Sequence, residues 1–481
     1  MESSKSSVGV ELEFLVAIAE ADQELNVPEM LENSIGVPIV LPPGVRNYSA
    51  RANDIARRRG EETIANAIAN CPGTRVVQSE EETISNPEAI HLRYHIEWSC
   101  GSDSSVSLPP DLQRQRYMNE YRWYAVEIAS PALWPTAESW ASIREVVQAF
   151  KDEYWIITPP SAGMHFHYGN GIDYIPFFKL RRMAALLVAV DPIMVQLHPN
   201  HRKVDEYCLS NRLYSRIAHG TSAAATSREL GAEYVEAEPE FPGVRRQPKP
   251  VARPFRRRTP NLIVPFKRGQ LEGYSLDKMF NHYWRDSTYD YDGINDPDQR
   301  PLEIPLAVRE ILRCTNSVTV AELMRYSPLP MDRPAYSFLA YTLLNYKQML
   351  TTNGIVDVDY QRKRTVEFRQ YASEMDPDCV VAHGKVVVRL CEIAADMDLE
   401  ELWQVALDCD VAEVNGNWYD VFDLLADFGL EEEAKVIQYS VARFRGETVP
   451  DNIVEDDGEA EAEAAARQRP SWSRWLSRGS N

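Results

Sequence analysis

Two carboxylates that stand two residues apart mark the first strand expected in this sequence. In Val8–Leu15, Glu11 and Glu13 project from one face of an extended strand, and the apolar residues between them take the other face. Like charges side by side on a half-buried strand repel and lose hydration, so they need a cation, a basic partner or solvent. A divalent metal such as Mg²⁺ prefers such oxygens. An amphipathic strand with its acidic face in water is the alternative.

Three further expected strands carry acidic or histidine side chains, and two of these strands carry a polar pair at the same spacing of two. They present Glu127 before Ser130-Pro131, His165 and His167 between flanking glycines, and Glu367 with Arg369. The flanking glycines allow a ligand to approach the backbone. Four strands therefore present side chains that can bind a metal or phosphate. A sheet with a purely structural role seldom needs so many of them.

The elements that must position these residues are helices and strands in mixed order. Apolar spacing predicts helices at 50–70, 137–150, 175–197, 306–314, 319–325, 335–346, 376–396, 399–409, 418–428 and 431–444. Strands are expected at 75–78, 91–98, 122–128, 156–169 and 365–370, and the Pro-, Gly- and Asn-rich stretch 28–47 predicts a loop.

Composition narrows the class of protein. The 481 residues are 44% hydrophobic and 26% charged, which is typical of a globular protein with a substantial core. A net charge of -21 argues against a general nucleic-acid or anionic-membrane binder. No apolar run is long enough to span a membrane, and the polar start of the chain gives no signal peptide. The 7 scattered cysteines suggest reduced thiols, so we expect a cytoplasmic protein.

Two segments depart from the rest in charge. Residues 238–268 are rich in Pro and Arg, with no acidic residue from Pro242 onward, which suits an exposed insert, a phosphate or anionic-partner site, or a nuclear-localisation patch. The tail 447–481 is acidic and Ala-rich before Trp472 and Trp475, so we expect disorder with a docking peptide near its end.

The motifs together resemble the amidoligase family of the glutamine synthetase and glutamate-cysteine ligase superfamily of carboxylate-amine ligases. The resemblance covers about residues 8 to 397 and rests on motifs in the family's order: Gly9–Phe14, Asp103–Ser105, Glu127–Leu133, Gly163–Gly169, Tyr207-Cys208 and Thr365–Gln370. It implies an α+β fold in which a curved antiparallel sheet like the glutamine synthetase catalytic domain is packed with helices. The implied organisation is a catalytic domain at 1–397, a helical region at 398–446 and the tail at 447–481.

The same resemblance implies roles for individual residues. Glu11, His165 and Glu367 would hold a metal at the ATP phosphates, Glu13 and Glu127 a metal near the substrate carboxylate, and Arg369 the transferring phosphoryl group. Asp103 and Ser105 would orient the substrate or its amine, and His167 is a further nucleotide-side residue. A second carboxylate for the substrate-side metal is missing from the matched motifs, with Glu97 and Glu120 as candidates.

The implied reaction is ATP- and Mg²⁺-dependent amide formation through an acyl phosphate, with Mn²⁺ as a substitute ion. Such chemistry needs positioning, charge neutralisation and exclusion of water rather than a protein nucleophile. The partners are then a small-molecule or peptide acid and an amine. After Gln370 the chain reads Tyr371–Asp376, where the family tends to have a His and a Gly-Thr, so substrate contacts there could differ.

Three other functions are compatible with parts of the pattern. His165 and His167 with a glutamate could bind zinc in a hydrolase, although a surplus of carboxylates favours a harder ion. Cys208 with His198 or His201 could serve a cysteine hydrolase, but a small residue packed under a loop explains it as well. A non-catalytic binding or scaffold relative would keep the sheet alone.

Overall fold

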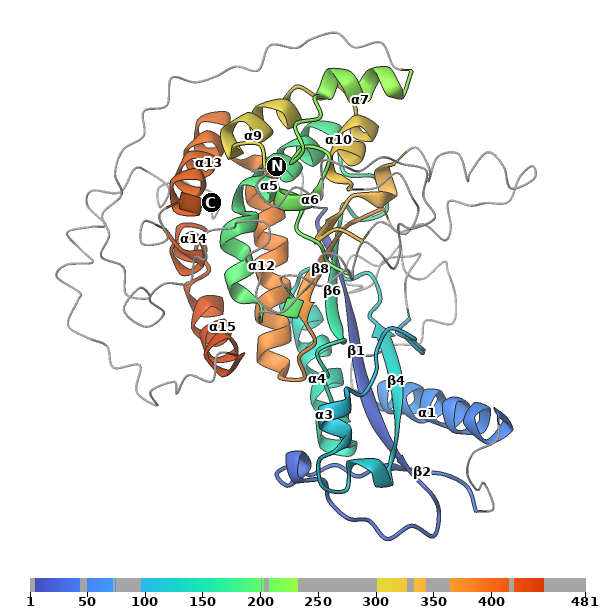
Figure 1. The fold of residues 1–481 in the computed structure, drawn as a ribbon. Helices are drawn as coiled ribbons and strands as arrows, with labels where there is room; N and C mark the ends of the chain where they lie inside the picture. The colour runs from blue at the N-terminus through green and yellow to red at the C-terminus, as the bar shows by residue number, and fades with distance from the viewer. Residues whose placement is uncertain are drawn as a thin grey trace, which may run out of the picture. The chain divides into compact units, whose positions relative to one another are not determined.

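The computed structural model describes residues 5–43, 50–71, 74, 97–199, 201–202, 207–231, 301–326, 333–342, 364–414 and 419–444 (Figure 1). The chain forms two compact units, Met1–Tyr174 with Tyr371–Val388, and Ile175–Gln370 with Arg389–Asn481. Helices and a curved, unclosed, mainly antiparallel sheet confirm the predicted α+β class. The predicted basic insert and tail lie outside the described residues.

The first unit is built on the long strand β1 (Ser7–Ala19). Strand β4 (Arg122–Ala129) runs antiparallel along one edge of β1, and β3 (Ser99–Gly101) pairs with β4. The other edge of β1 is taken in turn by β6 (Gly163–Gly169), β5 (Ile156–Ile157) and β2 (Ile39–Val40), of which β2 is parallel. Strand β1 is thus paired along both edges, with β4 on one side and β6 on the other (Figure 1).

Three helices of this unit, α1 (Ala50–Asn70), α4 (Ala137–Glu153) and the first part of α12 (Pro377–Asp396), cover the face of β1 and its neighbours that lacks the carboxylates. The unit also contains α3 (Pro110–Gln113) and the 3-10 helices η1 (Glu29–Leu31) and η2 (Met118–Glu120). The Thr136 hydroxyl caps α4 by accepting from the Ser139 N–H. Phe150 of α4 then lies 5.8 Å from Phe14 of β1 between ring centroids.

The carboxylate face of β1 continues into a separate hydrophobic cluster. Beyond Glu13, the residues Leu15, Ala17 and Ala19 point the same way and are buried. They pack with Leu31, Val106, Met118, Tyr121, Trp155, Ile157 and Ala162. The polar half of this face therefore adjoins a packed core, which fixes the strand that carries the acids.

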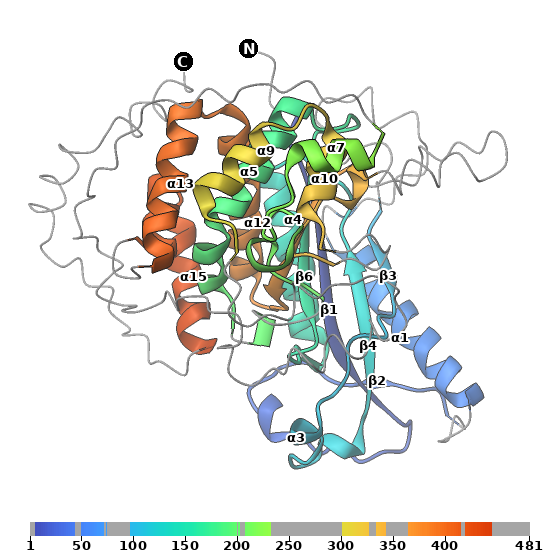
Figure 2. The same ribbon diagram turned by 45° about the horizontal axis from the view of Figure 1, so that its top comes forward.

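The second unit is mainly helical. Helix α5 (Phe177–Met194) packs against α6 (Asn211–Tyr214), α9 (Ile304–Leu312), α10 (Ser317–Met324) and α13 (Leu399–Val414), as Figure 2 shows for α5, α9 and α13. Also present are η3 (Val195–Leu197), α7 (Ala223–Glu229), β7 (Tyr336–Ser337), η5 (Leu339–Tyr341), β8 (Val366–Ala372) as far as Gln370, the last part of α12, α14 (Val421–Asp427) and α15 (Glu431–Phe444). Among the described residues, no helix has the length and hydrophobicity needed to span a membrane.

Most predicted elements match those observed, and one helix was wrong. Residues 335–346 were predicted as a helix, but the structure has β7 and η5 there, with 343–346 outside the described residues. Tyr336 pairs with Phe368 of β8, and the Ala335 carbonyl accepts from the Arg369 N–H at 2.8 Å. Pairing with a distant strand overrode the local helical pattern. The predicted strand at 75–78 and most of that at 91–98 lie outside the described residues.

Close packing of α12 depends on Gly384. A Cβ added there would lie 2.8 Å from Trp140 Cζ3 and 3.1 Å from Phe166 Cε1. Alanine gains up to about 1 kcal/mol of helix propensity, but overpacking a core costs about 1–3 kcal/mol. We expect Gly384→Ala to lower the free energy of unfolding by about 1 kcal/mol, measured by denaturant titration. Trp140→Phe in that background should recover part of the loss, and a more stable Gly384→Ala protein would contradict this packing.

The buried imidazole of His383 makes a prediction about pH. Burial lowers the pKa of His383 to about 3, and its ring lies 4.8 Å from that of Tyr371. The unfolded chain therefore binds a proton that the folded chain does not, so this group lowers stability as pH falls below about 6.5. The slope approaches about 1.4 kcal/mol per pH unit.

We expect His383→Phe to flatten the fall in unfolding free energy between pH 7 and pH 5, measured by urea titration. Asp191, whose pKa burial raises to about 6, acts in the opposite direction because its folded form holds its proton more tightly. Subtracting the variant's curve from the wild-type curve removes that contribution. Parallel curves would show that His383 does not titrate on unfolding.

Candidate active site

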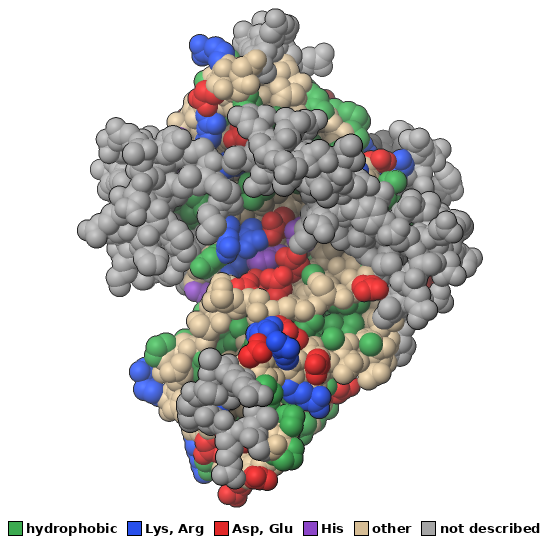
Figure 3. Space-filling view, turned by 90° about the vertical axis from the view of Figure 1, so that its right-hand side faces the viewer, with side chains coloured by type: hydrophobic (Ala, Val, Ile, Leu, Met, Phe, Trp, Pro, Cys, Tyr) green, Lys and Arg blue, Asp and Glu red, His purple; other side chains and the backbone are tan. Residues whose placement is uncertain are grey.

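Three carboxylates meet on one face of the first unit's sheet. Glu13 stands directly opposite Glu127 in the β1–β4 pair, and Glu127 stands opposite Gly101 of β3. Oxygen atoms of Glu13, Asp103 and Glu127 all lie within 4.8 Å of one another. Figure 3 shows acidic side chains and histidines gathered on one surface of the molecule. Three strands or strand ends thus bring together a donor set made of oxygen alone.

Asp103 reaches this cluster from the turn that follows β3. Its Oδ1 accepts from the Ser105 N–H at 2.7 Å, which closes a tight turn. The next residue, Val106, is buried in the cluster formed with Leu15 and Ala17, so the turn is anchored to the core. The Ser105 backbone, rather than its hydroxyl, makes this contact with Asp103.

Asp103 was predicted to orient the substrate or its amine, and it lies beside Glu13 and Glu127, the two residues for which the motifs gave no third carboxylate. The candidates considered for that position were Glu97 and Glu120. Glu97 is exposed ahead of β3, and Glu120 accepts from the Asn26 side chain at 3.0 Å in an exposed hydrogen bond. The grouping of Asp103 depends on the β3–β4 register, for which its sequence spacing from Glu127 gives no signal.

Both histidines of β6 contact Glu11. The register places His165 opposite Glu11 and His167 opposite Gly9. His167 Nε2 lies 3.1 Å from Glu11 Oε1, His165 Nδ1 lies 3.3 Å from Glu11 Oε2, and His165 Nε2 lies 3.6 Å from Glu13 Oε1. Glu11, Glu13, His165 and His167 are all buried. Glu11 therefore has two imidazoles beside it, and His165 stands between the two glutamates.

Glu367 and Arg369 belong to the second unit. They lie on β8, the strand predicted to carry both on one face, and they form an ion pair with each other. Arg369 Nε donates to the Tyr207 carbonyl at 3.1 Å, and Arg202 donates to the Arg369 carbonyl at 2.6 Å. The guanidinium of Arg369 is thus fixed by the segment that carries the Tyr207-Cys208 motif. Cys208 itself is buried, and its thiol donates to the Arg202 carbonyl at 3.1 Å, which suits the packing role.

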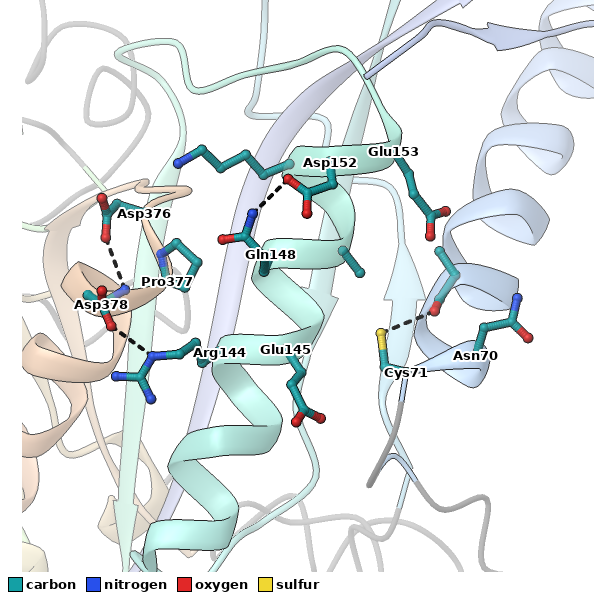
Figure 4. Close-up of a pocket in the computed structure, with 13 residues that line it drawn as sticks. Asn70, Cys71, Arg144, Glu145, Gln148, Asp152, Glu153, Asp376, Pro377 and Asp378 are labelled. Carbon is teal, nitrogen blue, oxygen red and sulfur yellow. Dashed lines mark hydrogen bonds and ion pairs between the residues drawn. The ribbon is translucent and has the colours of Figure 1, made fainter. Parts of the chain in front are cut away.

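A separate cavity of about 660 Å³ in the first unit contains none of the predicted site residues. Its lining includes Arg144, which pairs with Asp378 at 2.7 Å, and Gln148, which donates to Asp152 at 2.7 Å (Figure 4). Helix α4, which lines it, packs on the face of β1 opposite the carboxylates. These side chains bond to one another, and the cavity adds nothing to the candidate site.

Comparison with known proteins identifies the family. A family model described as "Putative amidoligase enzyme" matches residues 4–244, about half of the chain. The chain belongs to this amidoligase family. The resemblance seen in the motifs is thereby confirmed, and an enzyme of the ligase class is indicated. The β8 motif with Glu367 and Arg369 lies beyond the matched range. No curated protein and no solved structure matched the chain.

The donor set of this amidoligase-family chain fits a hard divalent cation. Glu13, Asp103 and Glu127 supply oxygen only, which suits Mg²⁺ or Mn²⁺ better than zinc. Glu13 Oε2 also accepts from the Gly163 N–H at 2.6 Å, so one oxygen is oriented by the backbone. An oriented carboxylate of this kind is typical of metal ligands supported by outer hydrogen bonds.

Divalent-ion binding should stabilise the protein through this cluster. We expect MgCl₂ or MnCl₂ to raise the melting temperature of the wild type, since a ligand at 100 times its Kd adds about 2.7 kcal/mol. Glu127→Gln should reduce the shift, and Glu120→Gln, an exposed glutamate changed in the same way, should not. Differential scanning fluorimetry measures all three. An equal shift in both variants would show that the ion binds elsewhere.

Proposed function

We propose that the chain is an ATP-dependent ligase that joins a carboxylic acid to an amine and uses Mg²⁺ or Mn²⁺. The observation that carries the proposal is the convergence of Glu13, Asp103 and Glu127 within 4.8 Å in a member of the amidoligase family. The balanced reaction is acid plus amine plus ATP giving amide, ADP and phosphate. The substrate carboxylate attacks the terminal phosphorus with loss of ADP, and the amine then displaces phosphate from the acyl phosphate.

The chain's own residues would divide this work by position on the sheet. Glu13, Asp103 and Glu127 would hold the ion on the acid-substrate side, and Glu11 with the β6 histidines would lie toward the nucleotide. The family resemblance adds Glu367 to the nucleotide side and Arg369 to the phosphoryl group, and these two roles stay predictions. A bound divalent ion would neutralise phosphate and carboxylate charge.

The geometry supports different roles for His167, Asp103 and Ser105 from those that the family resemblance implies. His167 and His165 both lie close to Glu11, at 3.1 Å and 3.3 Å. We therefore propose both histidines, rather than His165 alone, as metal-side groups near the nucleotide. Asp103 was expected to orient the substrate or its amine, and we now propose it as the third substrate-side ligand. Ser105 would then act through its backbone, which holds Asp103.

Turnover with paired substrates tests the proposal. Purified protein with ATP and MgCl₂ is screened against amino acids, peptides and polyamines, with ADP followed by a coupled assay and the amide by mass spectrometry. We expect ADP release to require both an acid and an amine. Asp103→Asn and Glu127→Gln should lower kcat/KM by about 10²-fold or more, since removing a charge-stabilising group typically costs that much. Glu120→Gln serves as the matched surface control.

Other outcomes would point to the alternatives. Stoichiometric zinc, with hydrolysis that is indifferent to ATP, would favour a hydrolase built on His165, His167 and Glu11. ATP binding that is unchanged by Mg²⁺ and by Glu11→Ala, with no amine-dependent turnover across the screen, would favour a non-catalytic binding protein.

A further inference from the structure

Strand β1 changes partners at Glu13. Its pairing with β6 ends at Leu12 opposite Met164, and its pairing with β5 begins at Leu15 opposite Ile157. Glu13 therefore stands between two ladders on that edge, at the point where the chain loops from β5 to β6. A metal-ligating residue at such a break needs other groups to fix its backbone and its carboxylate.

Ser373 occupies this break from a position 360 residues away in the sequence. It follows β8 directly, belongs to the first unit and is 6% exposed. Its hydroxyl donates to the backbone carbonyl of Glu13, and its N–H donates to the Ala162 carbonyl at 3.1 Å. One residue thus bonds both to β1 and to the loop that leads into β6.

These contacts close a ring of hydrogen bonds that runs through Glu13, the peptide group between Ala162 and Gly163, and Ser373. The Ala162 carbonyl and the Gly163 N–H belong to the same peptide group. That N–H donates to Glu13 Oε2 at 2.6 Å, while the carbonyl accepts from Ser373. Because bonds in such a chain polarise one another, the Ser373 N–H strengthens the donor that orients the carboxylate.

The residues on either side keep Ser373 in place. Tyr371 packs edge-on against Phe166 of β6, with ring centroids 5.2 Å apart. The buried carboxylate of Glu374 accepts from the N–H groups of Met375 and Asp376 at 2.9 and 3.0 Å, just before α12 begins. The serine is therefore held by packing before it and by a capped turn after it.

We propose that Ser373 is a positioning residue that holds the Glu13 carboxylate for the divalent ion of the proposed ligase. This inference rests on the proposed function for the ion, but the hydrogen-bonded ring can be measured without it. The segment Tyr371–Asp376, where the chain departs from the family's pattern, thereby acquires a role at the metal side of the site.

The test combines two measurements on the full-length protein. Hydrogen exchange by mass spectrometry follows peptides that contain the Gly163 amide, and Mn²⁺ binding is titrated by electron paramagnetic resonance. Ser373→Ala should speed Gly163 exchange and weaken Mn²⁺ binding by about 10-fold, within the range typical of groups that orient metal ligands. Ser373→Thr, which keeps the hydroxyl, should restore both. Ser142→Ala removes another buried serine hydroxyl of the same unit, on α4, and should change neither.

The outcomes separate this proposal from the proposed function. Wild-type affinity for Mn²⁺ in a folded Ser373→Ala protein would overturn the positioning role. If the wild type bound no Mn²⁺, the metal-dependent function would fail, and unchanged Gly163 exchange in Ser373→Ala would then overturn the positioning role as well. If Ser373→Ala did not fold, Ser373→Cys supplies the comparison, because its weaker donor should give an intermediate loss in both readouts, and no loss would count against the proposal.

Discussion

The opposition of Glu13 and Glu127 across the β1–β4 pair is the constraint on which the site depends. Like charges directly opposite each other in a sheet are destabilising, and Asp103 adds a third carboxylate within 4.8 Å. A fold keeps such a cluster only where the surrounding structure fixes it. Here the same face of β1 runs on into a packed cluster around Leu15 and Ala17, and helix α4 covers the opposite face through Phe150.

The supports of the site come from widely separated parts of the sequence. The Asp103 turn is anchored by Val106 in the core, and Glu11 is flanked by both histidines of β6. Ser373 joins the backbone of Glu13 to the peptide group that orients its carboxylate. An enzyme whose chemistry needs positioned charge rather than a protein nucleophile would depend on such backbone-held ligands.

The second unit has its own rigid arrangement around Arg369. The ion pair with Glu367 and the Tyr207 carbonyl fix the guanidinium in one orientation, and Arg202 donates to the backbone carbonyl of Arg369. Arginine held in this way is suited to phosphate because its donors match the oxygen geometry. The family model ends before β8, so the proposed role of Arg369 in binding the phosphoryl group rests on the chemistry of arginine and on the sequence motif.

The sequence by itself determined the features that follow from local periodicity. Alternation placed Glu11 and Glu13 on one face of a strand and His165 and His167 on one face of another, and apolar spacing located helices such as α1 and α4. The order of the motifs was enough to indicate the amidoligase family.

Only the tertiary structure decided which of these residues meet within the first unit. The register that sets Glu127 against Glu13, the arrival of Asp103 from the turn after β3, and the contact of Ser373 with Glu13 join residues up to 360 positions apart. The strand at β7, predicted as a helix, was likewise decided by its distant partner β8. Side-chain alternation is a property of a few neighbouring residues, whereas register and sheet breaks are fixed by packing among distant segments, which no local pattern encodes.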